Sequence, residues 1–260
     1  MGHKRPLVIG NWKMNLDFVE AIHLGQQIGV VLKNKPLEYC DLVVAVPFVD
    51  LRSVSSIIVS ERIAVGLGAQ HVNAHENGAH TGEVSVAMLK RLNVEWVIVG
   101  HSERRAHYAM DDVIVEATLR TVLRAGLNAV LCVGEGVDVR ESDAHERYVG
   151  EQLESALSGL DPHVRELVHV AYEPVWAIGT GVSASSEQVA AMTSFIRGRL
   201  AGLGLLDTRV LYGGSLNADN AATLMVEGGA DGFLVGGASL KAESFMAIAT
   251  ACDDCYAGNR

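Results

Sequence analysis

Short apolar runs recur along the chain, and each is flanked by a segment with apolar residues at helical spacing. The runs are rich in Val, Ile, Leu and Ala, which is typical of strands buried on both faces, as in parallel sheets. Eight strands are predicted in this way, at residues 7–12, 42–48, 63–70, 94–100, 128–134, 168–172, 210–213 and 232–235.

Amphipathic helices are predicted between the strands, with polar caps at their starts and glycine at several of their ends. They run from Asp17 to about Lys33, from Asp111 to Ala125, over 146–157, over 187–200 behind Ser185 and Ser186, and over 217–226. Strands that alternate with helices, without a Pro- or Ser-rich break, predict a single closed (β/α)8 barrel over residues 1–260.

A doubly wound open sheet is the alternative, because Gly179 to Ala184 matches a relaxed dinucleotide-binding pattern, G-x-G-x-x-A. That motif needs a tight turn from strand to helix and an acidic residue about 20 positions further on. Here residues 173–178 occupy the place of the turn, and no acidic residue lies at that spacing. The barrel is therefore the favoured architecture.

Composition limits the function classes. The 260 residues are 49% hydrophobic and 20% charged, and the net charge of -10 disfavours nucleic acid or an anionic membrane as a partner. No run of about 18 apolar residues is present to span a membrane. The four cysteines lack the spacing of a disulfide framework, so a reducing, cytoplasmic location is expected. Cys252 and Cys255 form a lone C-x-x-C, for which a mobile or helix-end tail is the simpler interpretation.

The sixth predicted strand ends in a carboxylate, and in an α/β barrel the reactive groups lie at the carboxyl ends of the strands. Glu173 stands at this end, and Pro174 permits no further ladder hydrogen bond. The apolar residues 175–178 and then Gly179-Thr180-Gly181 follow, which suggests a lid that closes over a substrate and excludes water. A kinked strand with a partly buried loop is the alternative.

Other strand ends carry polar or glycine-rich residues. Lys13, after the first strand, can pair with an anion, although an exposed loop lysine is the alternative. His101, after the fourth strand, begins a helical turn where an imidazolium is disfavoured, so a neutral hydrogen-bond donor is expected. Two Gly-Gly steps, before Ser215 and at Gly236-Gly237, can present backbone N–H groups to a phosphate.

Residues 70–84 form a long polar loop without an apolar period. Its histidines, His71, His75 and His80, fit no common spacing of metal ligands. A loop of this length is usually functional, and docking to a partner subunit is the expected role.

A base, a neutral donor, a cation, a phosphate cradle and a lid together suit one kind of reaction. They can remove a proton next to the carbonyl of a small phosphorylated substrate, with His101 and Lys13 stabilising the charge on an enediolate oxygen. A closed lid would also keep an enediolate phosphate from eliminating its phosphate in water.

Five motifs resemble those of the triosephosphate isomerase family and cover nearly the whole chain in the right order. They are Gly10-Asn-Trp-Lys-Met-Asn15, Val97-Ile-Val-Gly-His-Ser-Glu-Arg-Arg105, Ala171-Tyr-Glu-Pro-Val-Trp-Ala-Ile-Gly-Thr-Gly181, Tyr212-Gly-Gly-Ser215 and Leu234-Val-Gly-Gly-Ala-Ser-Leu240. The resemblance implies interconversion of dihydroxyacetone phosphate and D-glyceraldehyde 3-phosphate, in glycolysis and gluconeogenesis, without a cofactor or a metal.

The resemblance also implies a role for each matching residue. Glu173 would move the proton between two carbons, and His101 would polarise the carbonyl. Lys13 and Asn11 would hold the substrate, and Glu103 would support Lys13. The phosphate would be held by Gly179, Ser215, Gly236 and Gly237.

A homodimer is a further implication of the resemblance. Residues 78–84 resemble an interdigitating loop, with Thr81 reaching the partner's site. Met14 resembles a residue that this loop covers, and Glu83 and Arg105 resemble a pair that steadies it.

Two alternative functions fit the sequence less well. A non-catalytic phosphate-binding barrel would lack Glu173, His101 or Lys13, and all three are present. A different phosphate-dependent barrel enzyme would share the Gly-Gly cradle but not the lid. This chain also departs from the family at two positions of the loop. The family often has an aromatic residue where this chain has His80, and Asn where it has His71, so the packing of the loop is expected to differ.

Overall fold

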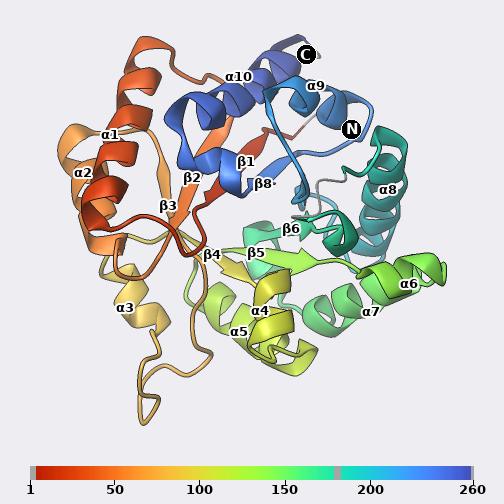
Figure 1. Cartoon of the computed structure of the whole chain (residues 1–260). Helices are drawn as coiled ribbons and strands as arrows, with labels where there is room; N and C mark the ends of the chain where they lie inside the picture. The colour runs from red at the N-terminus through yellow and green to blue at the C-terminus, as the bar shows by residue number, and fades with distance from the viewer. Residues whose placement is uncertain (1–3, 179–182, 259–260) are drawn as a thin grey trace.

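Eight parallel strands form one closed barrel in the computed structural model, which describes residues 4–178 and 183–258. Each strand pairs with the next in sequence, and β8 pairs with β1 to close the barrel (Figure 1). The strands are β1 (Leu7–Asn11), β2 (Asp41–Val46), β3 (Gly66–Ala69), β4 (Trp96–Val99), β5 (Asn128–Val133), β6 (Val168–Tyr172), β7 (Val210–Tyr212) and β8 (Gly232–Val235). The predicted (β/α)8 TIM barrel is confirmed, and the open sheet is excluded.

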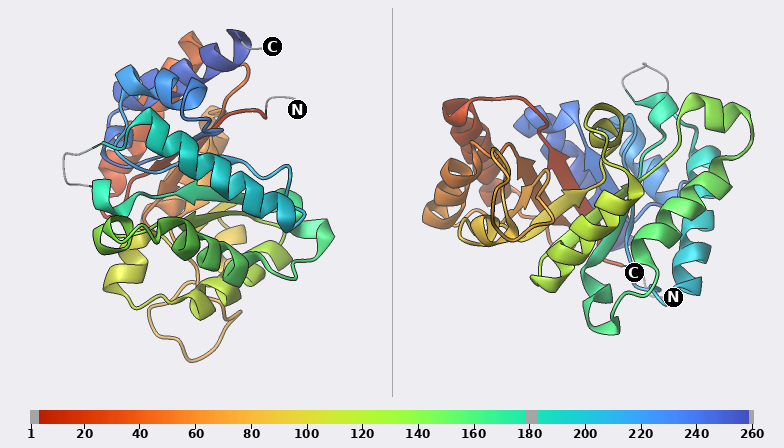
Figure 2. Two further views of the ribbon diagram at one scale, coloured as in Figure 1. Left: turned by 90° about the vertical axis from the view of Figure 1, so that its right-hand side faces the viewer. Right: turned by 90° about the horizontal axis from the view of Figure 1, so that it is seen from below.

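Helices cover the outside of the barrel, as the two further views show (Figure 2). The α-helices are α1 (Phe18–Asn34), α2 (Leu51–Glu61), α3 (Val86–Lys90), α4 (Ser102–His107), α5 (Asp112–Arg124), α6 (Val137–Glu141), α7 (His145–Leu157), α8 (Ser186–Gly202), α9 (Ala218–Val226) and α10 (Ala242–Gly258). Three short 3₁₀ helices are η1 (Pro162–Leu167), η2 (Val175–Ala177) and η3 (Gly237–Leu240). Cys252 and Cys255 lie within α10, the last helix of the chain, and Cys252 is buried, which agrees with the helix-end interpretation of the C-x-x-C.

Two predicted strands begin too early, because apolar residues that close a helix look like strand residues in sequence. Arg62 adopts a left-handed conformation at the end of α2, and the N–H of Ile63 returns to the carbonyl of Ile58. The N–H of Val94 similarly returns to Leu89 after α3. These bonds satisfy backbone groups at the helix ends, so β3 and β4 start later than the apolar pattern suggests.

Polar caps set the starts of the long helices. Asp17 accepts hydrogen bonds from two backbone N–H groups of the first turn of α1, and the Glu20 carboxylate accepts one from the N–H of Asp17. Ser185 and Gln188 form the same reciprocal pair at α8. Each such cap typically contributes about 0.5–2 kcal/mol to stability.

The strands separate two apolar layers. One layer fills the inside of the barrel, and the other lies between the barrel and the helices. Along β6, Ala171 belongs to the inner layer, whereas Val170 and Tyr172 belong to the outer one. Because side chains alternate along a strand, His169 and Glu173 share the inner side with Ala171.

His169 is a buried histidine at the start of β6. It is 4% exposed, and its Nδ1 accepts a hydrogen bond of 3.4 Å from Nε of Arg209. Its ring lies against Trp96, with centroids 5.0 Å apart, and its Nε2 has no hydrogen-bond partner among the described residues. Burial, followed by the charges of Arg209 and Lys4, lowers the pKa of His169 to about 3.

This histidine should make the protein less stable in mild acid. The unfolded chain protonates His169 near pH 6.5, whereas the folded chain does so near pH 3. The unfolded state therefore binds more protons between these values, and the free energy of unfolding falls as the pH falls through this window. From pH 7 to pH 5, the loss due to this one group should be about 2 kcal/mol.

The measurement is urea unfolding at pH 7 and pH 5 for the native chain, His169→Gln and His163→Gln, which is an exposed control. The His169→Gln variant should lose about 2 kcal/mol less than the native chain over this pH step. Equal pH dependence of all three proteins would contradict the role of His169.

Candidate active site

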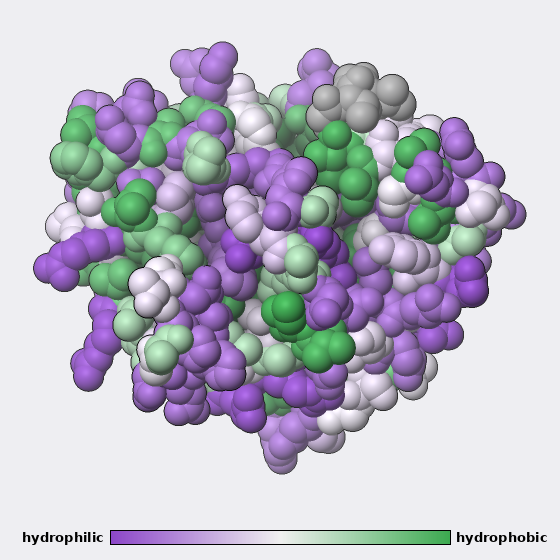
Figure 3. Space-filling model, turned by 60° about the horizontal axis from the view of Figure 1, so that its bottom comes forward, coloured by the Kyte–Doolittle hydropathy of each residue, from purple (hydrophilic) through white to green (hydrophobic). Residues whose placement is uncertain are grey.

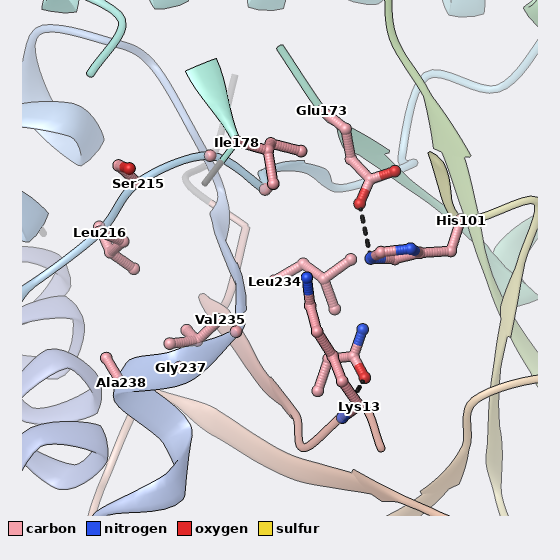
Figure 4. A pocket seen from close by; sticks show the side chains of 14 residues that line it. Lys13, His101, Glu173, Ile178, Ser215, Leu216, Leu234, Val235, Gly237 and Ala238 are labelled. Atoms are coloured by element: carbon pink, nitrogen blue, oxygen red, sulfur yellow. Dashed lines mark hydrogen bonds and ion pairs between the residues drawn. The ribbon is translucent and has the colours of Figure 1, made fainter. Parts of the chain in front are cut away.

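The carboxyl ends of the strands surround a pocket of about 280 Å³ (Figure 4). Its lining residues come from β1, β4, β6, β7 and β8 and from the loops that follow them. They are Asn11, Lys13, His101, Glu173, Ile178, Gly213, Gly214, Ser215, Leu216, Leu234, Val235, Gly236, Gly237 and Ala238. The structure thus gathers groups that lie up to 227 residues apart, from Asn11 to Ala238, in one cavity.

Glu173 follows directly after β6 and is 2% exposed. Its Oε1 lies 3.0 Å from Nε2 of His101, and its Oε2 accepts the N–H of Ser102 at 2.8 Å. Burial raises the pKa of this carboxyl, but the attraction of His101 and the hydrogen bonds from His101 and Ser102 outweigh it, so the pKa lies below its usual value. The side chain is therefore an ionised base inside the protein.

His101 is the residue before α4, and its ring points towards Glu173 (Figure 4). Burial lowers its pKa, the charge of Glu173 raises it, and the net direction is upward. Nδ1 accepts the N–H of Glu103 at 3.2 Å, which a protonated Nδ1 could not do. The upward shift of the pKa by itself favours a protonated ring, but the hydrogen bond at Nδ1 needs a lone pair there. We therefore assign a neutral ring with its proton on Nε2, directed at the carboxylate.

Lys13 has a left-handed backbone, with φ of 53°, which is uncommon for a residue other than glycine. Its N–H donates to Oδ1 of Asn11 at 3.0 Å, and its carbonyl accepts Nε2 of Gln70 at 2.9 Å. Its Nζ lies 2.5 Å from Oε1 of Glu103. The side-chain amides of Asn11 and Gln70 therefore hold the strained backbone of Lys13. The ion pair with Glu103 holds the ammonium group of Lys13 at the pocket.

The glycine-rich loops after β7 and β8 also line the pocket. Gly213 lies close to Glu173, whereas Ser215 and Gly237 lie across the pocket from His101 (Figure 4). Ser215 lies in the loop that precedes α9, whose cap is Asn217. Gly236 immediately precedes η3, a 3₁₀ helix of four residues that begins at Gly237. A Cβ at Gly237 would meet no atom within 4 Å, so this backbone is open to the cavity.

The end of the sixth strand leads into η2, and Ile178 reaches the pocket from there. The apolar segment of the expected lid is thus a short 3₁₀ turn. Gly179, Thr180 and Gly181 lie outside the described residues.

Glu135 is a site neighbour that the sequence analysis missed. It is fully buried, and its Oε1 accepts the hydroxyl of Tyr172 at 3.0 Å and Nε1 of Trp176 at 2.9 Å. Because it follows β5 by two residues, the rule that selected the other strand ends could have found it. Ser102 and Gln70 were also missed as site groups, since a backbone N–H and an amide outside the pocket carry no sequence signal of their role.

The residues expected at a dimer contact lie outside the pocket. The loop that carries Thr81 and Glu83 projects between β3 and α3, away from the barrel (Figures 1 and 2). Met14 is 93% exposed. Within the single chain, Glu83 accepts a hydrogen bond from Asn73, and Arg105 pairs with Asp112 rather than with Glu83.

No group of three or more His, Cys, Asp or Glu side chains is arranged to hold a metal ion in the described residues. The pocket instead offers a carboxylate, an imidazole N–H, an ammonium group and open glycine backbone. This combination can accept a proton from carbon, stabilise an adjacent oxyanion and bind a small anion.

Comparison with known proteins agrees with this site. The family model for triosephosphate isomerase matches residues 6–252. The triosephosphate isomerase of Nocardia farcinica is 45% identical over 94% of this chain and 95% of its own length, and that of Mycobacterium tuberculosis is 45% identical over 95% and 96%. The solved structure of triosephosphate isomerase from Bartonella henselae has a TM-score of 0.85 and 34% identity, and covers 95% of this chain and 98% of its own.

The sequence comparisons and the structure comparison both match triosephosphate isomerases over nearly the full length of this chain. The site geometry is what an aldose–ketose isomerisation of a small phosphate ester requires. The chain therefore belongs to the triosephosphate isomerase family and is an enzyme that isomerises triose phosphates.

Proposed function

We propose that Glu173 is the base that interconverts dihydroxyacetone phosphate and D-glyceraldehyde 3-phosphate through an enediolate. The observation that carries this is the buried carboxylate of Glu173, which lies in the pocket 3.0 Å from Nε2 of His101. Glu173 takes a proton from the carbon beside the carbonyl and returns it to the neighbouring carbon. The pairing of a glutamate base with a neutral histidine is the general scheme already described for this enzyme.

His101 and Lys13 stabilise the oxygen on which negative charge develops. The imidazole donates from Nε2, because its Nδ1 already accepts the N–H of Glu103. Lys13 brings a positive charge to the same cavity, and Asn11 and Glu103 hold it there. When the substrate binds, the Nε2–H of His101 leaves the Glu173 carboxylate, 3.0 Å away in this structure, and donates to the substrate oxygen, while Lys13 supplies a cation that is already in place.

The phosphate binds to backbone N–H groups of Ser215, Gly236 and Gly237, opposite the base. These residues line the pocket, and the open space beside Gly237 admits a phosphate oxygen close to the backbone. Gly179 is the fourth proposed donor and lies outside the described residues. A phosphate held there places the carbon skeleton of a triose between the cradle and Glu173.

The segment from Val175 onwards acts as a lid whose entrance is held by Glu135. Trp176 donates to Glu135, and Ile178 lines the cavity. Closure excludes water, which prevents the enediolate phosphate from eliminating its phosphate. The alternative, a non-catalytic phosphate-binding barrel, is not favoured because it leaves the buried base and its imidazole partner without a purpose.

The first test is Glu173→Gln, which keeps the shape of the side chain but removes its proton-accepting charge. The kcat for D-glyceraldehyde 3-phosphate should fall by about 10³–10⁴-fold, since that is the upper range for a positioned general base. Binding of inorganic phosphate, followed by calorimetry, should remain as in the native chain. A variant with native turnover would show that another group is the base.

We further propose that two copies of the chain form a homodimer through the projecting loop that contains residues 78–84. Met14 stands almost fully exposed, and Val49 and Met88 are also exposed apolar residues. On the face turned forward in Figure 3, hydrophobic side chains form several separate patches within a largely polar surface.

A charge at Met14 should break this dimer. Met14→Glu would bury a carboxylate against the partner's loop, and the mass measured by light scattering should fall to that of one chain, 27.7 kDa. Val226→Glu is the control, because Val226 is an exposed apolar residue of α9. A native chain that is already monomeric would contradict the dimer.

The proposed reaction belongs to glycolysis and gluconeogenesis, and we assign the enzyme to the cytoplasm, where phosphorylated sugars are metabolised. Among the described residues, no helix is long and apolar enough to cross a membrane.

A further inference from the structure

The end of β5 supports both the base and the entrance of the lid. The N–H of Glu173 donates to the carbonyl of Val133 at 2.8 Å, and the N–H of Val175 donates to the carbonyl of Glu135 at 3.1 Å. The carboxylate of Glu135 also accepts Trp176, as described above. A displacement of this strand end would therefore move Glu173 and the lid together.

Gly134 lies at the centre of this support and cannot be replaced without moving it. A Cβ built on Gly134 would lie 1.8 Å from the carbonyl oxygen of Glu173. Such a distance is far inside the normal contact distance for two heavy atoms, so the two backbones touch here as only glycine permits.

The N–H of Gly134 has no strand to pair with on its other side. In the register of β4 with β5, the last residue of β4, Val99, lies opposite Leu131. The chain then turns away at Gly100, which has a φ of 73°, and β4 does not extend to the level of Gly134. A buried N–H left unpaired in this way would destabilise the fold.

Gln152 supplies the missing acceptor from the outer layer of helices. It is a residue of α7 that is only 3% exposed, and its Oε1 accepts the N–H of Gly134 at 2.9 Å. The other buried residues of α7 are Val149, Gly150, Leu153, Ala156 and Leu157. A glutamine is thus the one polar side chain on an otherwise apolar helix face, and its amide is used to hold the strand end beside the base.

We propose that Gln152 is a positioning residue of the isomerase, which sets the place of the Glu173 carboxylate and of the lid entrance through Gly134 without touching the substrate. This inference rests on the proposed role of Glu173 as the base. A misplacement of about 1 Å can cost about 10²-fold in rate, so one hydrogen bond outside the pocket is enough to affect kcat.

The test compares Gln152→Met, which keeps length and bulk but removes the acceptor, with Gln152→Glu, which keeps an acceptor oxygen. In Gln152→Met, kcat should fall by about 10- to 100-fold, while the Kd of inorganic phosphate should change by less than about twofold, because the cradle lies on the opposite side of the pocket. Gln152→Glu should recover most of the lost kcat. Amide exchange of residues 131–136 should become faster in Gln152→Met and not in Gln152→Glu.

Thr193→Val is the matched control. Thr193 is a buried residue of α8 whose Oγ1 donates to the carbonyl of Gly228 at 2.7 Å, before β8 and outside the pocket lining. Like Gln152→Met, the Thr193→Val variant loses a buried hydrogen bond between a helix and a loop. It should therefore be less stable than the native chain but keep the native kcat.

Three outcomes would overturn the inference: native kcat in Gln152→Met, an equal loss of kcat in Thr193→Val, or a joint loss of kcat and phosphate binding in Gln152→Met. Glu173→Gln, measured in the same series, distinguishes failure of the proposed base from failure of the proposed role of Gln152. If Glu173→Gln loses turnover while Gln152→Met keeps it, only the role of Gln152 falls. If Glu173→Gln keeps native turnover, the proposed base and the role of Gln152 fall together.

Discussion

The central constraint on this molecule is the presence of an ionised carboxylate inside a protein core. Glu173 is almost completely removed from water, which by itself would favour its neutral form. The Nε2–H of His101 and the N–H of Ser102 compensate for the lost water. Removal of one partner from a buried pair of this kind typically costs about 3–5 kcal/mol. These contacts join the residues after β4 to the residue after β6, so the relative placement of the two strand ends depends on Glu173 being ionised.

Strand β6 and the residue after it provide two buried titratable groups, one held neutral and the other charged. His169 lies near the start of β6 and Glu173 directly after its end, and by alternation both face the same side as Ala171 of the inner layer. At the start of the strand, burial and the cation of Arg209 keep His169 neutral. At its end, hydrogen-bond donors keep Glu173 charged. The same strand thus contributes a group that acid destabilises and a group that must remain ionised for chemistry.

Support for the site comes in successive layers around the barrel. The strand ends provide backbone groups and the side chains nearest the pocket. Side-chain amides then hold the strand ends, since Gln70 holds the carbonyl of Lys13 and Gln152 holds the N–H of Gly134. Glycine allows the closest contact, at Gly134 against the carbonyl of Glu173. Precise placement of the base therefore depends on residues that never meet a substrate.

The sequence by itself determined the barrel and most of the pocket. Buried parallel strands are nearly uniformly apolar, so their number and order were readable, and a polar residue just after such a strand stands out at Lys13, His101 and Glu173. The limits of β3 and β4 were not readable, because apolar residues such as Ile63 and Val94 close helices instead.

Only the tertiary structure decided how these groups are held. The contacts of Glu135 with Trp176, of Gln70 with Lys13 and of Gln152 with Gly134 join residues that are 18 to 57 positions apart. Glu135 stands just after a strand, but nothing in the local pattern shows which groups these three side chains hold. Their roles arise because barrel closure places particular backbone groups beside them, and a buried backbone group must find a partner.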